Sequence, residues 1–125
     1  MAEDKGIIAE LFWKINEPKD KNNMDDLEKK HTPVLEFPAK VKKGEAFELG
    51  VKVGSMPHPM QNAHFIQFVD LFVDGLYFTR VNFTPVVTEP KAKISVILSA
   101  GKEISAVIRC NLHGLWKSSY PIRVE

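Results

Sequence analysis

Residues 47–53 read FELGVKV and have the most regular hydrophobic pattern for assigning the fold class. Apolar side chains occupy every second position, and polar residues or glycine occupy the positions between them. A period of two is typical of a β-strand that buries one face and exposes the other. The stretch therefore predicts a strand that covers a hydrophobic core on one side.

Further segments of this kind follow at short intervals. Lys43-Gly44, Asp74-Gly75 and Ala100-Gly101 are turn signals between them. Beyond the N-terminal region no segment has a convincing helical period. The sequence predicts an all-β fold, an immunoglobulin-like antiparallel β-sandwich of about seven strands with a short N-terminal arm. The predicted strands are 33–37, 46–54, 64–73, 76–84, 92–99, 103–110 and 120–124.

The N-terminal region has a different character. From residue 17 to 30 the chain is polar and highly charged, which is typical of a solvated loop. We interpret residues 1–30 as an arm and loop and residues 31–125 as the domain, and the role of residues 1–16 stays open. Before Pro18, apolar residues fall at spacings that line one face of a short helix: Ile7, Ile8, Leu11, Phe12 and Ile15.

Composition sets limits on function. A chain of 125 residues with 44% hydrophobic residues can build one packed core. Its net charge of +1 favours neither nucleic acid nor an anionic membrane as a partner. No apolar run approaches the roughly 18 residues that span a bilayer. Residues 1–5 are too acidic for a secretory signal, so we expect a cytoplasmic protein.

The chain has one cysteine and four histidines. A single cysteine excludes an internal disulfide and the Cys-x-x-Cys pairs of zinc-ribbon sites, so any metal must rely on histidine. Cys110 ends a predicted strand and continues its core-facing row, Ile104, Ala106 and Ile108. Taken alone, a free cysteine in such a row is most often a small buried hydrophobe.

The histidines and the cysteine all lie where loops meet predicted strands. His58 stands between two prolines, which stiffen its loop, and His64 opens the next strand. His113 follows Cys110 in CNLHGLW (residues 110–116), where a strand runs into a turn. Each histidine alone is better explained as an ordinary core or surface residue. Together with His31 before the first predicted strand, they indicate a metal site at one end of the sandwich.

Three segments resemble one family. KHTPV (30–34), MPHPM-x-x-x-HFI (56–66) and CNLHGLW (110–116) are similar, in this order along the chain, to the motifs of superoxide reductases, the neelaredoxins and the iron domain of desulfoferrodoxin. The resemblance covers residues 28–125. It implies the one-iron type, because the additional domain with four cysteines that some members carry is missing.

The resemblance also implies a cofactor and a reaction. A mononuclear iron that alternates between Fe2+ and Fe3+ reduces superoxide to hydrogen peroxide at an open sixth position. The backbone N–H groups of Leu112 and His113 are implied as donors to the sulfur, which tunes the potential. In this chain the implied ligands are four equatorial histidines and an axial thiolate: His31, His58, His64, His113 and Cys110.

The chain departs from the family beside the first histidine. Members usually read Glu-Lys-His, in which the lysine attracts the anion and the glutamate closes the sixth position of the ferric form. Here Lys30 keeps the place of the lysine, but Lys29 stands where the glutamate is expected and Glu28 lies one residue further away. Either the loop bulges so that Glu28 reaches iron, or the ferric site stays open to water or an anion. We favour the open site.

The implied partners are superoxide as substrate and a rubredoxin-like electron donor. We expect no nucleic acid and no membrane as partners. One-iron relatives are commonly tetramers, so we predict a homo-oligomer, with a tetramer favoured over a dimer.

Two other classes of protein compete with this interpretation. A cupredoxin-like electron-transfer site needs two histidines, a cysteine and a methionine after the second histidine. No methionine follows His113, and two histidines would be left over. A non-catalytic sandwich with a structural zinc would need four ligands, usually in two close pairs, and only Cys110 and His113 are close in sequence.

Overall fold

The alternating stretch forms a central strand, as predicted. In the computed structural model, which describes residues 9–125, strand β4 (Ala46–Val53) buries Leu49, Val51 and Val53 and exposes Glu48 and Lys52. It lies between β2 (Pro33–Glu36) and β7 (Lys91–Ile97), and both pairings are antiparallel. Over the described residues these strands form a three-stranded sheet.

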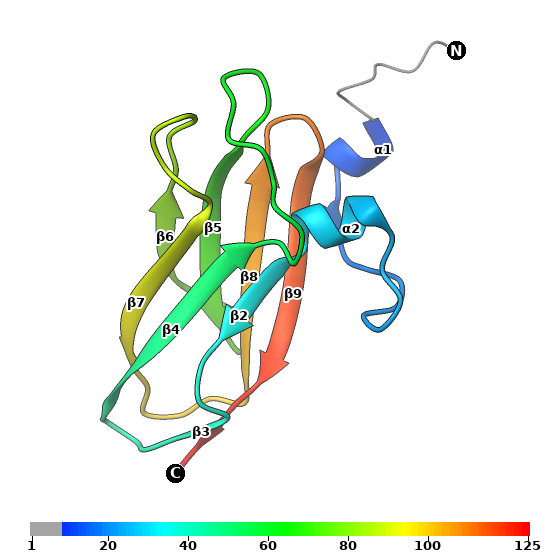
Figure 1. Cartoon of the computed structure of the whole chain (residues 1–125). Coiled ribbons are helices and arrows are strands. Elements are labelled where there is room, and N and C mark those ends of the chain that lie inside the picture. Colours follow the sequence, from blue (N-terminus) through cyan, green and yellow to red (C-terminus); the bar gives the residue numbers. More distant parts are fainter. Residues whose placement is uncertain (1–8) are drawn as a thin grey trace.

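A second sheet packs against the first and completes the sandwich (Figure 1). Within residues 9–125 it has the order β1-β9-β8-β5-β6. Its strands are β1 (Ile15–Asn16), β5 (Ile66–Val73), β6 (Leu76–Asn82), β8 (Glu103–Cys110) and β9 (Gly114–Pro121). Counted over the part of the chain that the structure describes, strands of four or more residues number seven. The predicted sandwich of about seven strands is confirmed.

The core lies between the two sheets. Ile104, Ala106, Ile108 and Cys110 form a single inward row on β8, and each is fully buried. The prediction that Cys110 continues the core-facing row is therefore confirmed. At roughly 25 cal/mol per Å² of buried apolar surface, this row and its partners supply much of the driving force for folding. Its partners in the core are Leu49 and Val51 of the other sheet and, beside it on β5 and β9, Ile66, Leu71 and Trp116.

The prediction for residues 114–121 was wrong. These residues form β9, which pairs with β8 along its whole length, whereas the sequence predicted a strand only from residue 120. The inward positions of β9 include Ser118, so the apolar period of two is interrupted. Ser118 Oγ donates to Pro33 O at 2.6 Å and thereby links the two sheets.

Residues 17–30 are not entirely loop, which is a second correction. Helix α2 (Asp26–His31) begins inside this segment and ends at His31. Leu27, in its first turn, packs against the core. Helix α1 (Ala9–Phe12) lies within the predicted N-terminal helix, but Ile15 belongs to β1, and Ile7 and Ile8 lie outside the described residues.

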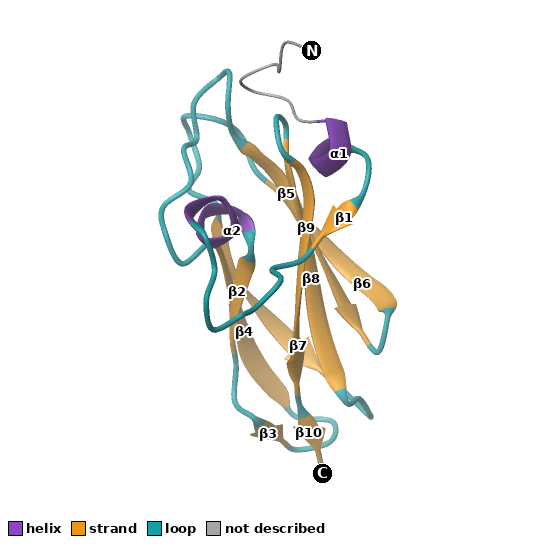
Figure 2. Cartoon of the chain, turned by 90° about the vertical axis from the view of Figure 1, so that its right-hand side faces the viewer, coloured by secondary structure: helices purple, strands orange, loops and turns teal. Residues whose placement is uncertain are grey.

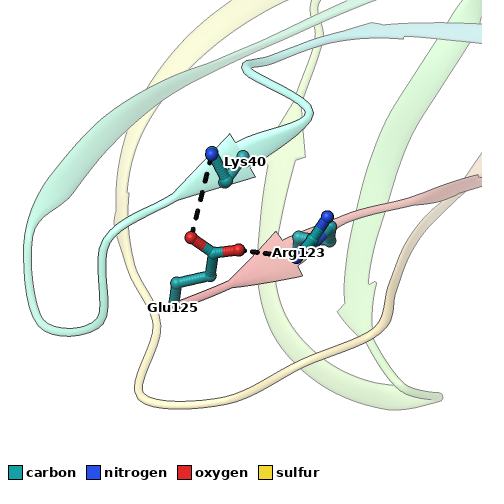
Figure 3. A network of polar contacts seen from close by, with 3 residues as sticks. All are labelled: Lys40, Arg123 and Glu125. Carbon is teal, nitrogen blue, oxygen red and sulfur yellow. Dashed lines mark hydrogen bonds and ion pairs between the residues drawn. The ribbon is translucent and has the colours of Figure 1, made fainter.

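The sandwich has two different ends (Figure 2). The short helices lie toward one end, and the C-terminus lies at the other. There β10 (Arg123–Val124) pairs with β3 (Lys40–Val41) in parallel. Glu125 joins them through ion pairs of 3.8 Å to Lys40 and 2.7 Å to Arg123 (Figure 3). None of the helices in residues 9–125 has the length and apolar character needed to cross a bilayer.

Candidate metal site

The β8–β9 hairpin brings a cysteine and a histidine together. Cys110 and Gly114 are the last pair of the ladder, so residues 111–113 form a short connecting loop. Within this loop His113 turns its Nδ1 to 3.7 Å from the Cys110 sulfur. Gly114 has a φ of +78°, a conformation that glycine adopts readily, and the strand restarts immediately after the histidine.

His31 is delivered by the end of helix α2. Its side chain is 1% exposed, and its Nδ1–H donates to the Leu27 carbonyl at 2.7 Å, one helical turn earlier. This bond leaves Nε2 as the nitrogen that faces the site. Trp116 of β9 stacks on the His31 ring at a centroid distance of 5.2 Å. The same indole donates to the His113 carbonyl at 3.0 Å, so it contacts two of the candidate ligands.

The connection between β4 and β5 supplies the other two histidines. His58 Nδ1–H donates to the Pro59 carbonyl at 2.7 Å, which turns Nε2 toward His31 Nε2 at 3.2 Å. His64 pairs with Gln61 through two backbone hydrogen bonds of 2.9 and 3.0 Å, and this bridge closes the loop. The positions of both imidazoles are therefore defined by backbone contacts within the loop.

The imidazoles form a square. Neighbouring ring centroids are 4.7 Å apart for His31–His58, 4.6 Å for His58–His64, 5.2 Å for His64–His113 and 4.9 Å for His113–His31. His31 and His64 are 6.4 Å apart, as expected across a diagonal. Neighbouring rings are steeply inclined, at 67° to 78°, whereas the diagonal pair is inclined by 29°.

The atoms that could bind a metal converge in this square. One ligand atom from each of His31, His64, Cys110 and His113 lies within 4.8 Å of the others. His58 joins them through its Nε2, 3.2 Å from that of His31. Two nitrogens bound side by side to one metal at about 2.1 Å would be about 3 Å apart. The separation of these two nitrogens is therefore close to that of adjacent ligands.

The residues fit a bound metal. Nε2 of His64 is buried and has no hydrogen-bond partner among the described residues. His31 and His58 direct two unprotonated nitrogens at each other, because the proton of each ring is on Nδ1. Buried nitrogen lone pairs without donors are unfavourable unless a cation accepts them. Imidazole and thiolate donors suit iron, copper or zinc.

Burial keeps the histidines neutral. Desolvation lowers the pKa of His31 to about 4 and that of His58 to about 3. It also lowers the pKa values of His64 and His113, which are partly exposed. A neutral imidazole is the form that binds metals, so at pH 7 these histidines are ready to act as ligands.

Two effects shift the pKa of the Cys110 thiol in opposite directions. Burial raises the pKa of the thiol, because a thiolate is unfavourable in an apolar environment. The backbone N–H groups of Leu112 and His113 donate to the sulfur and lower the pKa. These are the two amides that the resemblance implied.

The charged residues before His31 lie in two different places. Burial lowers the pKa of His64, and the positive charge of Lys30 lowers it further, so this ammonium acts on the site. Glu28 points elsewhere: its Oε1 accepts from the Asp25 N–H and its Oε2 from the Lys19 N–H, each at 3.0 Å. The structure thus brings Lys30 to the imidazoles and places Glu28 in the cap of α2.

Sequence reasoning missed two supporting residues. Asn111 Oδ1 accepts from the Phe65 N–H at 2.9 Å, and its Nδ2 donates to Ala63 O at 3.0 Å. Asn111 therefore ties the Cys110–His113 loop to both neighbours of His64. Trp116 is the other missed residue. Both lie in the motif CNLHGLW, but neither is a typical metal ligand, so the motif alone gave them no role.

The fold and this site define a class of protein. A β-sandwich that gathers four imidazoles in a square, with a buried cysteine beside them, is a metalloprotein of the histidine–thiolate type. Comparisons with known proteins then identify the family. The desulfoferrodoxin family model matches residues 23–119, and the chain belongs to this family.

Individual relatives agree with this assignment. A protein of Methanocaldococcus jannaschii with the provisional name superoxide reductase is 39% identical over 105 residues, which cover 80% of this chain and 88% of that protein. The superoxide reductase of Pyrococcus horikoshii is 33% identical over 99 residues, 71% of this chain and 84% of its own. The solved superoxide reductase (neelaredoxin) from Ignicoccus hospitalis has a TM-score of 0.78 at 34% identity, covering 89% of this chain and 95% of that one.

Proposed function

We propose that this protein is a superoxide reductase that reduces superoxide to hydrogen peroxide by one electron at a mononuclear iron. The observation that carries the proposal is the square of His31, His58, His64 and His113 with the Cys110 sulfur beside it. Relatives named superoxide reductase share most of the chain. We assign these five residues as the ones that would hold the iron, and the metal would then have one position left for the substrate.

The side chains have distinct tasks in this reaction. Iron supplies the electron that converts superoxide, with two protons, to hydrogen peroxide, and it alternates between Fe2+ and Fe3+. The imidazoles stay neutral because they are desolvated, which keeps protons from competing for their nitrogens. The amides of Leu112 and His113 stabilise negative charge on the Cys110 sulfur. They offset part of the effect of burial, which raises the pKa of the thiol, and a bound metal cation would favour the thiolate further.

Lys30 is the residue that we propose to attract the substrate. Its positive charge is close enough to lower the pKa of His64. A cation beside an open position raises the local concentration of a small anion and thereby the association rate. Superoxide carries one negative charge, so this contribution depends on ionic strength.

The remaining expectations complete the proposal. The donor that replaces the electron is a rubredoxin-like protein. We expect residues 31–125 to be the iron-binding domain and residues 1–30 to be an N-terminal arm, from which β1 joins the five-stranded sheet. We expect a homo-oligomer, a tetramer rather than a dimer, in the cytoplasm. The net charge of +1 argues against nucleic acid or an anionic membrane as partner.

The geometry favours iron over the competing metals. A cupredoxin-like copper site would use two of the histidines, yet all four imidazoles converge. A structural zinc site is closed by four ligands, and here a fifth donor is in place.

Metal analysis and a visible spectrum of the purified protein test the proposal. We expect one iron per chain and, in the oxidised form, an absorption band from charge transfer between thiolate and ferric iron. Cys110→Ser should abolish this band because the thiolate is lost. A colourless wild-type protein that holds one zinc per chain after expression with ample iron would refute the assignment.

A further inference from the structure

We propose that Glu28 positions His31, a proposed ligand, by capping helix α2. No side-chain carboxylate of this helix then closes the sixth position of the oxidised iron site. The position is then open to water or to a small inorganic monoanion. This inference rests on the proposed function, because it concerns the iron site. It assigns Glu28 a structural task in place of ligation.

Both carboxylate oxygens of Glu28 are already engaged. Glu28 and Asp25 form a capping box: the Glu28 N–H donates to Asp25 Oδ1 at 2.8 Å, and the Asp25 N–H donates to Glu28 Oε1 at 3.0 Å. The second oxygen accepts from the Lys19 N–H at 3.0 Å. To reach a metal, Glu28 would have to leave the Asp25 and Lys19 N–H groups without an acceptor.

The direction of the side chain opposes ligation as well. In an α-helix the Cα–Cβ bonds tilt toward the N-terminus. Glu28 is the third residue of α2 and extends back toward Asp25, whereas His31 is the last residue and faces the other imidazoles. The carboxylate is therefore held at the N-terminal end of α2, whereas the His31 ring belongs to its last residue.

The backbone around Glu28 resists a bulge. Its carbonyl accepts from the Thr32 N–H at 2.9 Å, and the next carbonyl, that of Lys29, accepts from the Met56 N–H at 3.2 Å. Gly54 packs so closely on Lys29 O that a Cβ there would collide with it. A bulge that delivered Glu28 to the site would disturb the cap and this contact together.

The cap supports the metal site through His31. Its ring is oriented by the bond from Nδ1 to Leu27 O, and Leu27 lies in the turn that the capping box fixes. Loss of the cap should loosen this turn and misorient the ring. Partners that orient ligands in this way typically change metal affinity by about 10- to 100-fold.

Three variants separate a cap from a ligand. Glu28→Gln keeps the capping box, because glutamine also serves at this position, but it removes the charge that ligation needs. Asp25→Ala removes the other half of the box without touching Glu28. Glu28→Ala removes the cap and any possible ligand together. The readouts are the Tm of the metal-free protein, iron affinity against a chelator, and the ferric spectrum with and without azide.

If Glu28 is a cap, Asp25→Ala and Glu28→Ala behave alike. Both should lower the Tm of the metal-free protein by about 3–6 °C and iron affinity by about 10-fold. Glu28→Gln should recover most of both losses, because its amide oxygen still accepts from the Asp25 N–H, and only the bond from the Lys19 N–H is lost. The ferric band should be the same in the wild type and in Glu28→Gln, and azide should bind to both with equal affinity.

If Glu28 is a ligand, the pattern is different. Glu28→Gln and Glu28→Ala would both shift the ferric band and strengthen azide binding, and Asp25→Ala would leave both unchanged. That result would overturn the inference. A wild-type protein without iron or without the band would instead refute the proposed function, and the Tm comparison would still decide whether Glu28 caps the helix.

Discussion

Backbone carbonyls decide which nitrogen two of the histidines present to the site. The carbonyls of Leu27 and Pro59 accept Nδ1–H from His31 and His58, and Nε2 is left for the metal. His113 differs, because its Nδ1 is the nitrogen near the Cys110 sulfur. Since main-chain atoms orient His31 and His58, their geometry depends on local backbone structure more than on neighbouring side chains.

The lowered histidine pKa values predict an acid-sensitive metal-free protein. His31 and His58 have pKa values of about 4 and about 3 in the folded state, against 6.5 without the fold. Between these values the unfolded chain binds more protons, so stability falls as pH decreases from 6.5 toward 4. At pH 5 the loss should be about 2 kcal/mol for each histidine.

Thermal unfolding of the metal-free protein at pH 7.5 and pH 5 measures this loss. His58→Gln serves as the control, since it removes one of the titrating groups and should make the decrease in Tm smaller. Equal Tm values for the wild type at both pH values would show that the buried histidines do not control acid stability.

Lys30→Ala should slow the reaction with superoxide. It removes the cation that acts on the imidazoles, and the second-order rate constant at low salt should fall by up to about 10-fold. The difference from the wild type should shrink as salt increases. Pulse radiolysis at two ionic strengths gives the rates. Lys43→Ala is the matched control, since it removes the same charge in the β3–β4 connection. If both variants react at the wild-type rate, Lys30 does not steer the anion.

Among the secondary-structure elements, most of the strands could be predicted from the sequence. The strands with apolar residues on one face, such as β4 and β8, were found because burial imposes a period of two. Strand β9 was missed because Ser118 occupies one of its inward positions. The buried Ser118 hydroxyl is tolerated in the core because it donates to Pro33 O, but a serine at this position interrupts the hydrophobic pattern of the strand.

Helix α2 was missed for a different reason. Its six residues are DLEKKH, and so charged a sequence is typical of a solvated loop. The helix that carries the candidate ligand His31 was therefore not predicted. The sequence held one signal, the spacing of Asp25 and Glu28, which is that of a capping box. The candidate ligands were predicted from motifs, whereas the square arrangement of the four imidazoles depends on how α2, the β4–β5 connection and the β8–β9 hairpin meet in space.

The β8–β9 hairpin makes a prediction about Gly114. A Cβ there would lie 2.5 Å from Leu11 O and 2.8 Å from Phe12 Cα, and φ is +78°. Gly114→Ala should therefore destabilise the protein by more than about 1 kcal/mol. Gly44 has the same φ of +78° with nothing within 4 Å, so Gly44→Ala isolates the conformational cost. Urea unfolding of both variants measures the difference. Equal losses would show that the contact with helix α1 is unimportant.

Across the whole molecule, the candidate metal site brings together residues that belong to different sheets and to the connection between them. Cys110 and His113 belong to the β8–β9 hairpin of the five-stranded sheet. His31 leads into β2 of the other sheet, and His58 and His64 lie on the connection between β4 and β5. The opposite end is closed by β3, β10 and Glu125. A bound metal would therefore connect both sheets at the end where the loops converge.

Product stoichiometry distinguishes reduction of superoxide from dismutation. The fully reduced protein, in excess, is mixed with superoxide, and hydrogen peroxide and dioxygen are quantified. A reductase should give one hydrogen peroxide for each superoxide consumed and release no dioxygen, because the electron comes from the protein. Half as much hydrogen peroxide, together with release of dioxygen, would show that the protein is a dismutase and refute the proposed function.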